Sequence, residues 1–295
     1  MHNITDIELL KIQECMMKMY LDIKYVCDKY NLTIFLGGGS ALGGIRHKGF
    51  IPWDDDMDLN MKRGDYEKLI SVLKEELGNE YDFSAPNSSC VDTPYLKIYK
   101  KDTYFPEVFS NMTYTEIWID VFPIDYAPKT KIMQKVKGII SDLLYFISVS
   151  TYIYQNKNED VAEAYTRNWR RSIRYYIGLL IGLIIRADYR YLYNLFNEFI
   201  TCKCPTKTMT VATGRNKYYG ECLSMDDIFP PRKINFNGEE ANVYHNVEKY
   251  LTRLYGDYMT IPPIEKREHH FIKGIKINED IKWKTENAKK FRLVK

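Results

Sequence analysis

The sequence lacks a strong excess of either charge. It has 42 Lys and Arg residues against 39 Asp and Glu, which leaves a formal net charge of +3 over 295 residues. A protein that binds a nucleic-acid duplex usually carries a basic stripe and a much higher isoelectric point, because it must neutralise phosphates. We therefore expect no nucleic-acid partner.

Cysteine is also scarce, with six residues in the chain, mostly inside apolar patterns. This low density favours free thiols in a reducing compartment over a disulfide framework. Cys202, Cys204 and Cys222 are candidates for a zinc site, but the paired spacing of a zinc ribbon is absent.

No charged-then-apolar signal sequence opens the chain, and long hydrophobic runs are few. The stretch 138–154 is interrupted by Asp142, and 175–185 has 11 residues, too few for the about 20 that span a bilayer. Each is either a buried helix or a segment that lies on a membrane surface. We expect a cytoplasmic protein, with peripheral contact at the inner membrane face as a further hypothesis.

Helix and strand patterns alternate in the first 125 residues. A capping box at 5–8 and an apolar stripe predict a long first helix through Tyr30. A short apolar strand stopped by glycine then leads into a brief helix from Ser40. Further strands are predicted at 57–61, 95–101 and 114–122, and an amphipathic helix at 64–77. This part of the chain is α+β.

The next segment has a different composition. Residues 129–190 contain 11 Lys or Arg and 5 Asp or Glu, a net of +6, and read as helices. Strand signals return at 233–244, where Asn237-Gly238 predicts a hairpin, and a helix follows at 246–256. The pattern favours a single catalytic domain over 1–295 with a helical insertion at 129–205.

Asp54, Asp55 and Asp56 are consecutive, and Asp58 follows them after a single residue, Met57. On a strand, Asp56 and Asp58 point to the same side, about 7 Å apart. Two such carboxylates repel each other and tend to retain a proton. A divalent cation removes the conflict, and Mg²⁺ commonly combines one or two carboxylates with phosphate oxygens. The residues therefore indicate metal-assisted phosphate chemistry, with Mg²⁺, or alternatively Mn²⁺, as cofactor.

Other motifs fit this stretch poorly. An EF-hand loop from Asp54 would have Leu59 in place of its glycine and Asp65 at its last position. The glycines lack the Gly-Lys-Ser/Thr of a Walker A loop, and Leu42 replaces the last glycine of a dinucleotide fingerprint. A solvated acidic loop is disfavoured because apolar Met57 and Leu59 alternate with the acids.

Three stretches resemble the LicD family of phosphotransferases, which is related to the fukutin-type enzymes and has a nucleotidyltransferase fold. They are "GGGSALGGIRHKGFIPWDDDMDL", "WIDVFPID" and "YLTRLYGDYMTIPPIEKREHH", and the likeness covers roughly residues 5–126 and 207–272. The resemblance implies an α+β fold with a nucleotidyltransferase-like mixed β-sheet core flanked by helices.

The resemblance also implies roles for individual residues. Gly38, Gly39 and Ser40 would hold nucleotide phosphates at a helix start. Asp56 and Asp58 would bind metal, and Asp120 would be a third metal ligand or the base on the acceptor hydroxyl. Further positive charge for the phosphates is expected from Arg46, His47, Lys48 and Lys97. Whether His269 and His270 reach the site stays open at this point.

LicD-like enzymes transfer phosphocholine or a similar group from a CDP-activated donor to a glycan hydroxyl and release CMP. Metal ions held by three carboxylates suit this chemistry, since phosphoryl transfer needs positioning and neutralised charge. The transferred group is choline, ethanolamine, glycerol or ribitol phosphate. The acceptor is a lipid-linked or free glycan of teichoic acid, capsule or lipopolysaccharide, and the insertion is a candidate for its recognition. A metal-dependent glycosyltransferase, a small-molecule nucleotidyltransferase and a nucleotide-sensing module remain alternatives.

Overall fold

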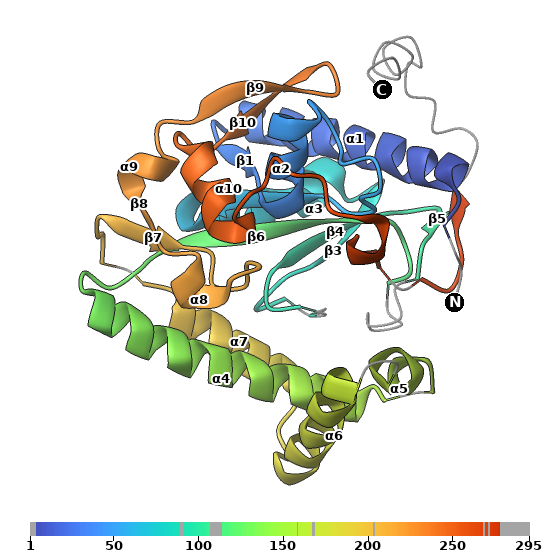
Figure 1. The fold of residues 1–295 in the computed structure, drawn as a ribbon, viewed down its shortest axis with the longest axis vertical. Coiled ribbons are helices and arrows are strands. Elements are labelled where there is room, and N and C mark those ends of the chain that lie inside the picture. Colours follow the sequence, from blue (N-terminus) through green and yellow to red (C-terminus); the bar gives the residue numbers. More distant parts are fainter. Residues whose placement is uncertain are drawn as a thin grey trace.

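A seven-stranded mixed sheet forms the centre of the computed structural model (Figure 1). The structure describes residues 4–88, 91, 93–106, 114–157, 159–166, 169–202, 204–267, 269–270 and 272–277. The strand order is β1–β2–β6–β4–β3, with β7 pairing β6, and β8 pairing β7. Strands β2 and β6 are parallel, whereas the other neighbours are antiparallel. The strands are β1 (Ile34–Leu36), β2 (Asp58–Lys62), β3 (Tyr81–Ser84), β4 (Leu96–Lys100), β6 (Trp118–Tyr126), β7 (Thr208–Thr210) and β8 (Leu223–Ser224).

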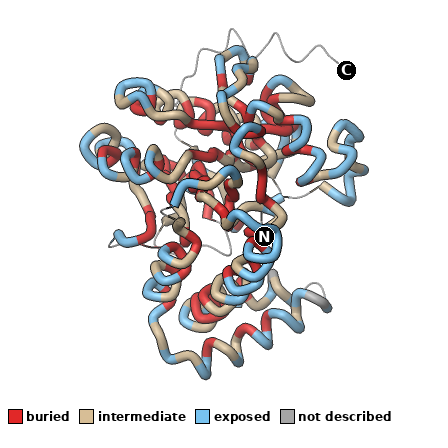
Figure 2. Tube along the Cα trace, turned by 90° about the vertical axis from the view of Figure 1, so that its left-hand side faces the viewer, coloured by how far each residue is buried: buried red, intermediate tan, exposed pale blue. Residues whose placement is uncertain are grey.

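Helices cover this sheet because each presents an apolar face to it. Helices α1 (Asp6–Lys29) and α3 (Arg63–Leu77) pack on each other and on β6, while α2 (Gly38–Arg46) packs on β1 and β2 and against α10 (Val247–Tyr255). The predicted capping box is present, with Thr5 accepting from the Glu8 N–H. Figure 2 shows the buried segments concentrated in this part of the molecule.

The smaller elements are β5 (Thr103–Tyr104), α8 (Lys217–Gly220), α9 (Met225–Ile228), β9 (Arg232–Phe236), β10 (Glu239–Val243), the 3₁₀ helix η1 (Ile264–Lys266) and β11 (Lys276–Ile277).

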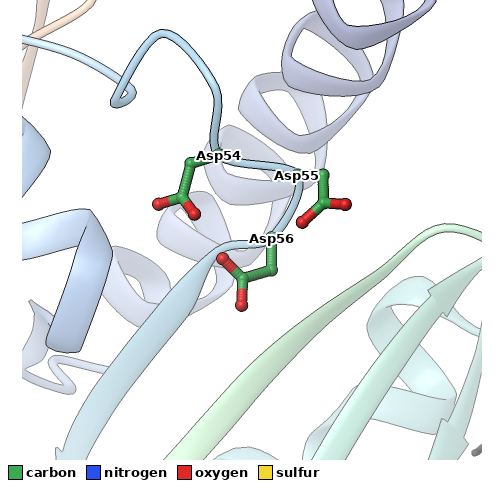
Figure 3. A group of neighbouring side chains, drawn as sticks. All are labelled: Asp54, Asp55 and Asp56. Atoms are coloured by element: carbon green, nitrogen blue, oxygen red, sulfur yellow. The ribbon is translucent and has the colours of Figure 1, made fainter. Parts of the chain in front are cut away.

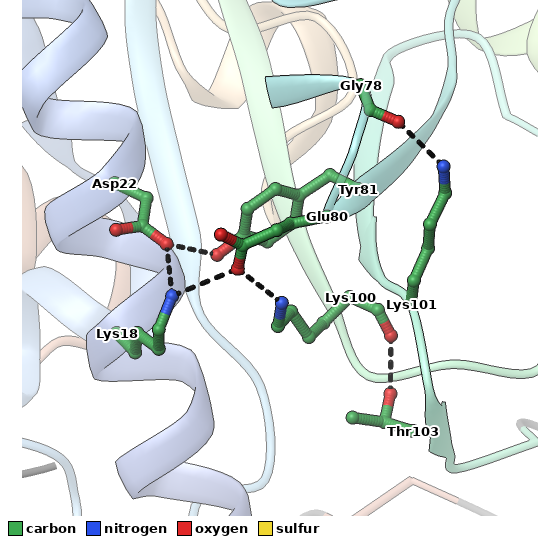
Figure 4. Close-up of polar contacts among 8 residues, drawn as sticks. All are labelled: Lys18, Asp22, Gly78, Glu80, Tyr81, Lys100, Lys101 and Thr103. Carbon is green, nitrogen blue, oxygen red and sulfur yellow. Dashed lines mark hydrogen bonds and ion pairs between the residues drawn. The ribbon is translucent and has the colours of Figure 1, made fainter. Parts of the chain in front are cut away.

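A polar network ties α1 to the outer strands β3 and β4 (Figure 4). The Lys18 Nζ lies 2.7 Å from Asp22 and 3.2 Å from Glu80, and Lys100 reaches Glu80 at 2.8 Å. The Tyr81 hydroxyl donates to the Asp22 carboxylate at 2.5 Å. Because the partners come from three elements, the network fixes the position of α1 along the sheet edge.

Four helices, α4 (Lys131–Gln155), α5 (Glu159–Thr166), α6 (Trp169–Ile184) and α7 (Tyr189–Ile200), lie together on one side of the sheet (Figure 1). Helix α4 packs on α6, α7 and α8. A buried ion pair anchors this group to the sheet domain: Arg63 pairs with Asp125 of β6 at 2.5 Å and also donates to Asn197 of α7 at 3.0 Å.

The predicted fold class is confirmed: the chain is α+β, with a mixed sheet flanked by helices. The helices after residue 129 and the hairpin at Asn237-Gly238 are also as predicted. Strand β3 was not predicted, and the strand predicted at 114–122 begins at Trp118 and continues to Tyr126. Strand β2 begins at Asp58, so the placement of Asp56 within it was wrong.

Candidate active site

The glycines after β1 allow two carboxylates to approach the first turn of α2. Gly38 has a φ of +41°, and a Cβ added there would lie 2.7 Å from the Asp58 Oδ2. A Cβ on Gly39 would lie 2.9 Å from the Asp54 Oδ2. The main-chain N–H groups at a helix start favour negative charge, so this turn suits anionic groups.

Asp58 is held from both sides of its main chain. Its N–H donates to the Ser40 Oγ at 2.9 Å, and its carbonyl accepts from the Gly37 N–H at 2.9 Å. Ser40 is buried, and this hydroxyl contact joins α2 to the start of β2. The proposed contact of Ser40 with a phosphate stays a prediction.

Carboxylates crowd together in front of this turn. Oxygen atoms of Asp54, Asp55 and Asp56 lie within 4.8 Å of one another (Figure 3). Asp58 is the register partner of Asp120 across the parallel pair β2–β6. The sheet thus brings the predicted third carboxylate next to the second.

The buried, crowded carboxylates of this cluster favour a bound cation. Burial raises the pKa of Asp54 and of Asp58, and the neighbouring carboxylates raise both further. Burial also raises the pKa of Asp56, although His270 partly lowers it. Hard divalent cations prefer such all-oxygen donor sets. The buried carboxylates therefore suit a divalent cation such as Mg²⁺. The predicted ligands Asp56, Asp58 and Asp120 stay predictions, and Asp54 is a further candidate because its oxygen groups with those of Asp55 and Asp56.

The C-terminal segment closes over the acidic cluster. His270 Nδ1 lies 2.9 Å from the Asp55 Oδ1, and the His270 N–H donates to the other oxygen of the same carboxylate at 3.0 Å. The Nε2 lies 3.8 Å from the Asp56 Oδ2. His270 therefore reaches the site, and His269 also lines the adjoining pocket. Asp55, buried and paired in this way, holds the segment in place.

Lys97 of β4 lies beside the third carboxylate. Its Nζ is 3.3 Å from the Asp120 Oδ1 and 4.4 Å from the centre of the Trp118 ring. Both charged groups are buried. Lys97 thus places a fixed positive charge at the edge of the acidic cluster.

A pocket of about 760 Å³ opens in front of the cluster. This volume lies within the roughly 300–1,000 Å³ typical of ligand sites and suits a nucleotide. Arg46 lines it and donates to the Tyr258 carbonyl at 2.7 Å, and burial lowers the Arg46 pKa. Trp53 lines it as well, with the Arg267 guanidinium 4.0 Å from its ring centre. His47 and Lys48 belong to the turn after α2 and are not among its lining residues.

Several lining residues were missed from the sequence. Burial raises the pKa of Glu221 to about 7, and this carboxyl accepts from the Asn216 N–H at 3.0 Å. Tyr250 of α10 accepts from the Gly38 N–H at 3.0 Å. Tyr250 is the first residue of the third stretch that resembles the LicD family, although nothing there marked its role, and no quoted stretch contains Glu221.

Comparison with known proteins gives three matches. A family model described as "LicD/FKTN/FKRP, nucleotidyltransferase domain" matches residues 31–146, which include the glycine turn, the acidic cluster and Asp120. The chain is 25% identical over 264 residues to "Lipopolysaccharide cholinephosphotransferase LicD" of Haemophilus influenzae, covering 84% of this chain and 89% of the relative. An uncharacterized protein of Rickettsia prowazekii is 31% identical over 74 residues, 24% of this chain and 28% of that protein.

Proposed function

We propose, from the premise that this chain belongs to the LicD family, that it is a metal-dependent phosphotransferase. It moves phosphocholine, or a related phospho-substituent, from a CDP-activated donor to a hydroxyl of a cell-surface glycan, and CMP is released. The observation that carries this proposal is the set of buried carboxylates packed against the glycine turn at the start of α2. The similarity to a lipopolysaccharide cholinephosphotransferase favours choline as the group and a lipopolysaccharide glycan as the acceptor.

In the proposed reaction the acceptor oxygen attacks the phosphorus that bears the choline. The bond from that phosphorus to the CMP oxygen breaks, and CMP leaves with the electron pair. Asp56, Asp58 and Asp120 would hold a divalent cation, which would supply positive charge to neutralise the transferred phosphate. The first turn of α2 and Lys97 bind the phosphate oxygens, and the acceptor proton passes to a carboxylate of the cluster. Asp120 is the candidate base in the alternative in which it does not ligate the cation.

The test measures CMP release and phosphocholine incorporation into a lipopolysaccharide glycan from CDP-choline, with Mg²⁺ and with EDTA. We expect Mg²⁺-dependent transfer, and we expect Asp58→Asn to reduce it by about a hundredfold or more, as losing a charge-stabilising group does elsewhere. Asp102→Asn is the matched control, since Asp102 is exposed in a turn with a φ of 63° that Asn tolerates.

Other products would overturn the proposal. Transfer of a sugar from UDP-glucose alone would identify a glycosyltransferase. A nucleotide found on the acceptor would identify a nucleotidyltransferase, and tight CDP-choline binding without turnover would identify a sensing module.

We also propose that the protein contacts a membrane through α4 and α6. Helix α4 exposes one continuous apolar stripe, and α6 exposes another, each at the spacing of a single helix face. Exposed cations accompany both helices, which suits an anionic leaflet. The apolar residues are Ile132, Met133, Val136, Ile139, Ile140 and Leu143 on α4, and Trp169, Ile173, Tyr176, Ile177, Leu180, Leu183 and Ile184 on α6.

Among the described residues, α4 is also the one helix long and apolar enough to cross a membrane, with 39% of its most apolar window buried. Its packing on α6, α7 and α8 favours surface contact, because crossing would expose those partners. A lipid-linked acceptor at this membrane surface would be bound by the same protein that carries the acidic cluster. The cytoplasmic location expected from the sequence is compatible with contact at the inner face of the membrane.

Cosedimentation with anionic vesicles at low salt tests this contact. We expect binding, and we expect the pair Ile139→Glu and Leu180→Glu to abolish it. Ile7→Glu on α1 is the control, because Ile7 and Ile139 are each 70% exposed. If the unmodified protein stays in the supernatant, the apolar stripes have another role.

A further inference from the structure

A second, smaller cavity lies next to the acidic cluster. Its volume is about 200 Å³, below the range of nucleotide-sized sites, and it shares His270 with the larger pocket. Lys97 and Asp120 form the wall nearest to the cluster, since Asp120 is the register partner of Asp58. The cavity is therefore placed to receive a group attached to a phosphate bound at the cluster.

The lining of this cavity is unusually rich in one residue type. Six of its lining residues are tyrosines, and they come from both the sheet and the helical segment after it. Tyr95 and Tyr99 lie before and within β4, whereas the others lie on α4, α5 and α7. Apolar Val149, Ile153 and Val161 complete these walls. The tyrosines are Tyr95, Tyr99, Tyr145, Tyr152, Tyr165 and Tyr193.

Neighbouring aromatic rings hold these tyrosines in place. Tyr99 stacks on Tyr114 with ring centres 4.4 Å apart, and Tyr95 lies 4.5 Å from Phe122. The ring of Tyr152 lies 6.3 Å from that of Tyr193. The cavity is thus bounded by aromatic side chains fixed before a ligand arrives.

The chemistry of the lining selects the type of ligand. Aromatic faces attract cations, most of all quaternary ammonium groups, which carry methyl groups instead of hydrogen-bond donors. Lys97 and Asp120 also line the cavity, and because they pair at 3.3 Å their charges offset each other. The Lys97 ammonium also lies 4.4 Å from the centre of the Trp118 ring. The attraction for a cation therefore comes from the tyrosine faces.

We infer that this tyrosine-lined cavity binds the quaternary ammonium head of the transferred group while its phosphate lies at the acidic cluster. The inference rests on the proposed function and deepens it, because it assigns a trimethylammonium donor, in preference to one bearing an amine or a polyol. The helices α4, α5 and α7 then select the donor head group, whereas the sequence alone had suggested that they recognise the acceptor.

Binding of four ligands tests the inference: CDP-choline, CDP-ethanolamine, CDP-ribitol and CMP, each measured by calorimetry with Mg²⁺. We expect the unmodified protein to prefer CDP-choline to CDP-ethanolamine. Tyr145→Leu should weaken CDP-choline binding by about tenfold or more and leave CMP binding unchanged, whereas Tyr145→Phe, which keeps the ring face, should stay within about threefold. Tyr165→Leu and Tyr165→Phe repeat the comparison on another helix. Tyr154→Leu is the control, because Tyr154 is a partly buried tyrosine of α4 outside the cavity lining.

The outcomes separate this inference from the proposed function. Equal affinity for CDP-choline and CDP-ethanolamine, together with no effect of Tyr165→Leu, would overturn the cavity assignment even if transfer activity is intact. Phe variants as damaging as the Leu variants would also overturn it, because recognition would then depend on the hydroxyls and favour ribitol. If Asp58→Asn binds none of the four ligands, CMP included, the nucleotide site stays supported. If the unmodified protein itself does not bind CMP, the result counts against the proposed function.

Discussion

Replacing Gly38 with Ala tests the link between the glycine turn and the acidic cluster. The φ of +41° at Gly38 costs an Ala about 1–2 kcal/mol. The new Cβ would also lie 2.7 Å from the Asp58 Oδ2. Because hydrogen bonds to Gly37 and Ser40 hold the Asp58 main chain, the carboxylate itself must rotate away.

The variant should therefore lose more activity than stability. A loss of about 1–2 kcal/mol corresponds to a fall in melting temperature of roughly 2–8 °C for a domain of this size. The displaced carboxylate, in contrast, would no longer face the position of the proposed cation. We expect CMP release to fall by at least about tenfold and to need more Mg²⁺.

Thermal unfolding and CMP release over a range of Mg²⁺ concentrations measure the two effects. Gly64→Ala is the control, since nothing lies within 4 Å of a Cβ added there on α3, and it should be neutral or stabilising by up to about 1 kcal/mol. If Gly38→Ala lowers the melting temperature while its Mg²⁺ dependence and activity match the unmodified protein, the turn does not position Asp58 for catalysis.

Three further outcomes follow from the structure. The pKa of Glu221 is raised from 4.5 to about 7, so its contribution to stability is present below pH 4.5 and is lost as the pH rises through 7. As the pH rises from 4 to 8, the unfolding free energy of Glu221→Gln should therefore increase by about 3 kcal/mol relative to that of the unmodified protein. An unfolding free energy that changes with pH by the same amount in both proteins would contradict this. Arg63→Met leaves the buried Asp125 carboxylate uncompensated and should cost about 3–5 kcal/mol in urea unfolding, partly recovered by adding Asp125→Leu. Thr5→Ala removes the cap of α1 and should cost about 0.5–2 kcal/mol, and a smaller change would mean that the first turn frays already.

Local patterns were sufficient for much of the fold. The capping box, the glycine after β1 and the Asn237-Gly238 turn act over a few residues, and the helices and the hairpin they predict are present. Strand β3 was missed because it has only four residues, too few for the alternation of Tyr81 and Phe83 with polar residues to stand out. The start of β2 after Asp56 was misplaced because strand boundaries depend on pairing with β1 and β6, which residue alternation does not reveal.

The candidate site divides in the same way. Sequence by itself determined that a glycine turn precedes a group of aspartates, because these residues are close in the chain and their types limit the chemistry. The family resemblance implied that Asp120 would join Asp58, and the tertiary structure shows how, since the parallel register of β2 and β6 makes the two residues neighbours. The tertiary structure alone brought His270 to Asp55 and gathered tyrosines from three helices around one cavity. Such contacts join residues far apart in the chain, and packing of the sheet and helices, not local preference, brings them together.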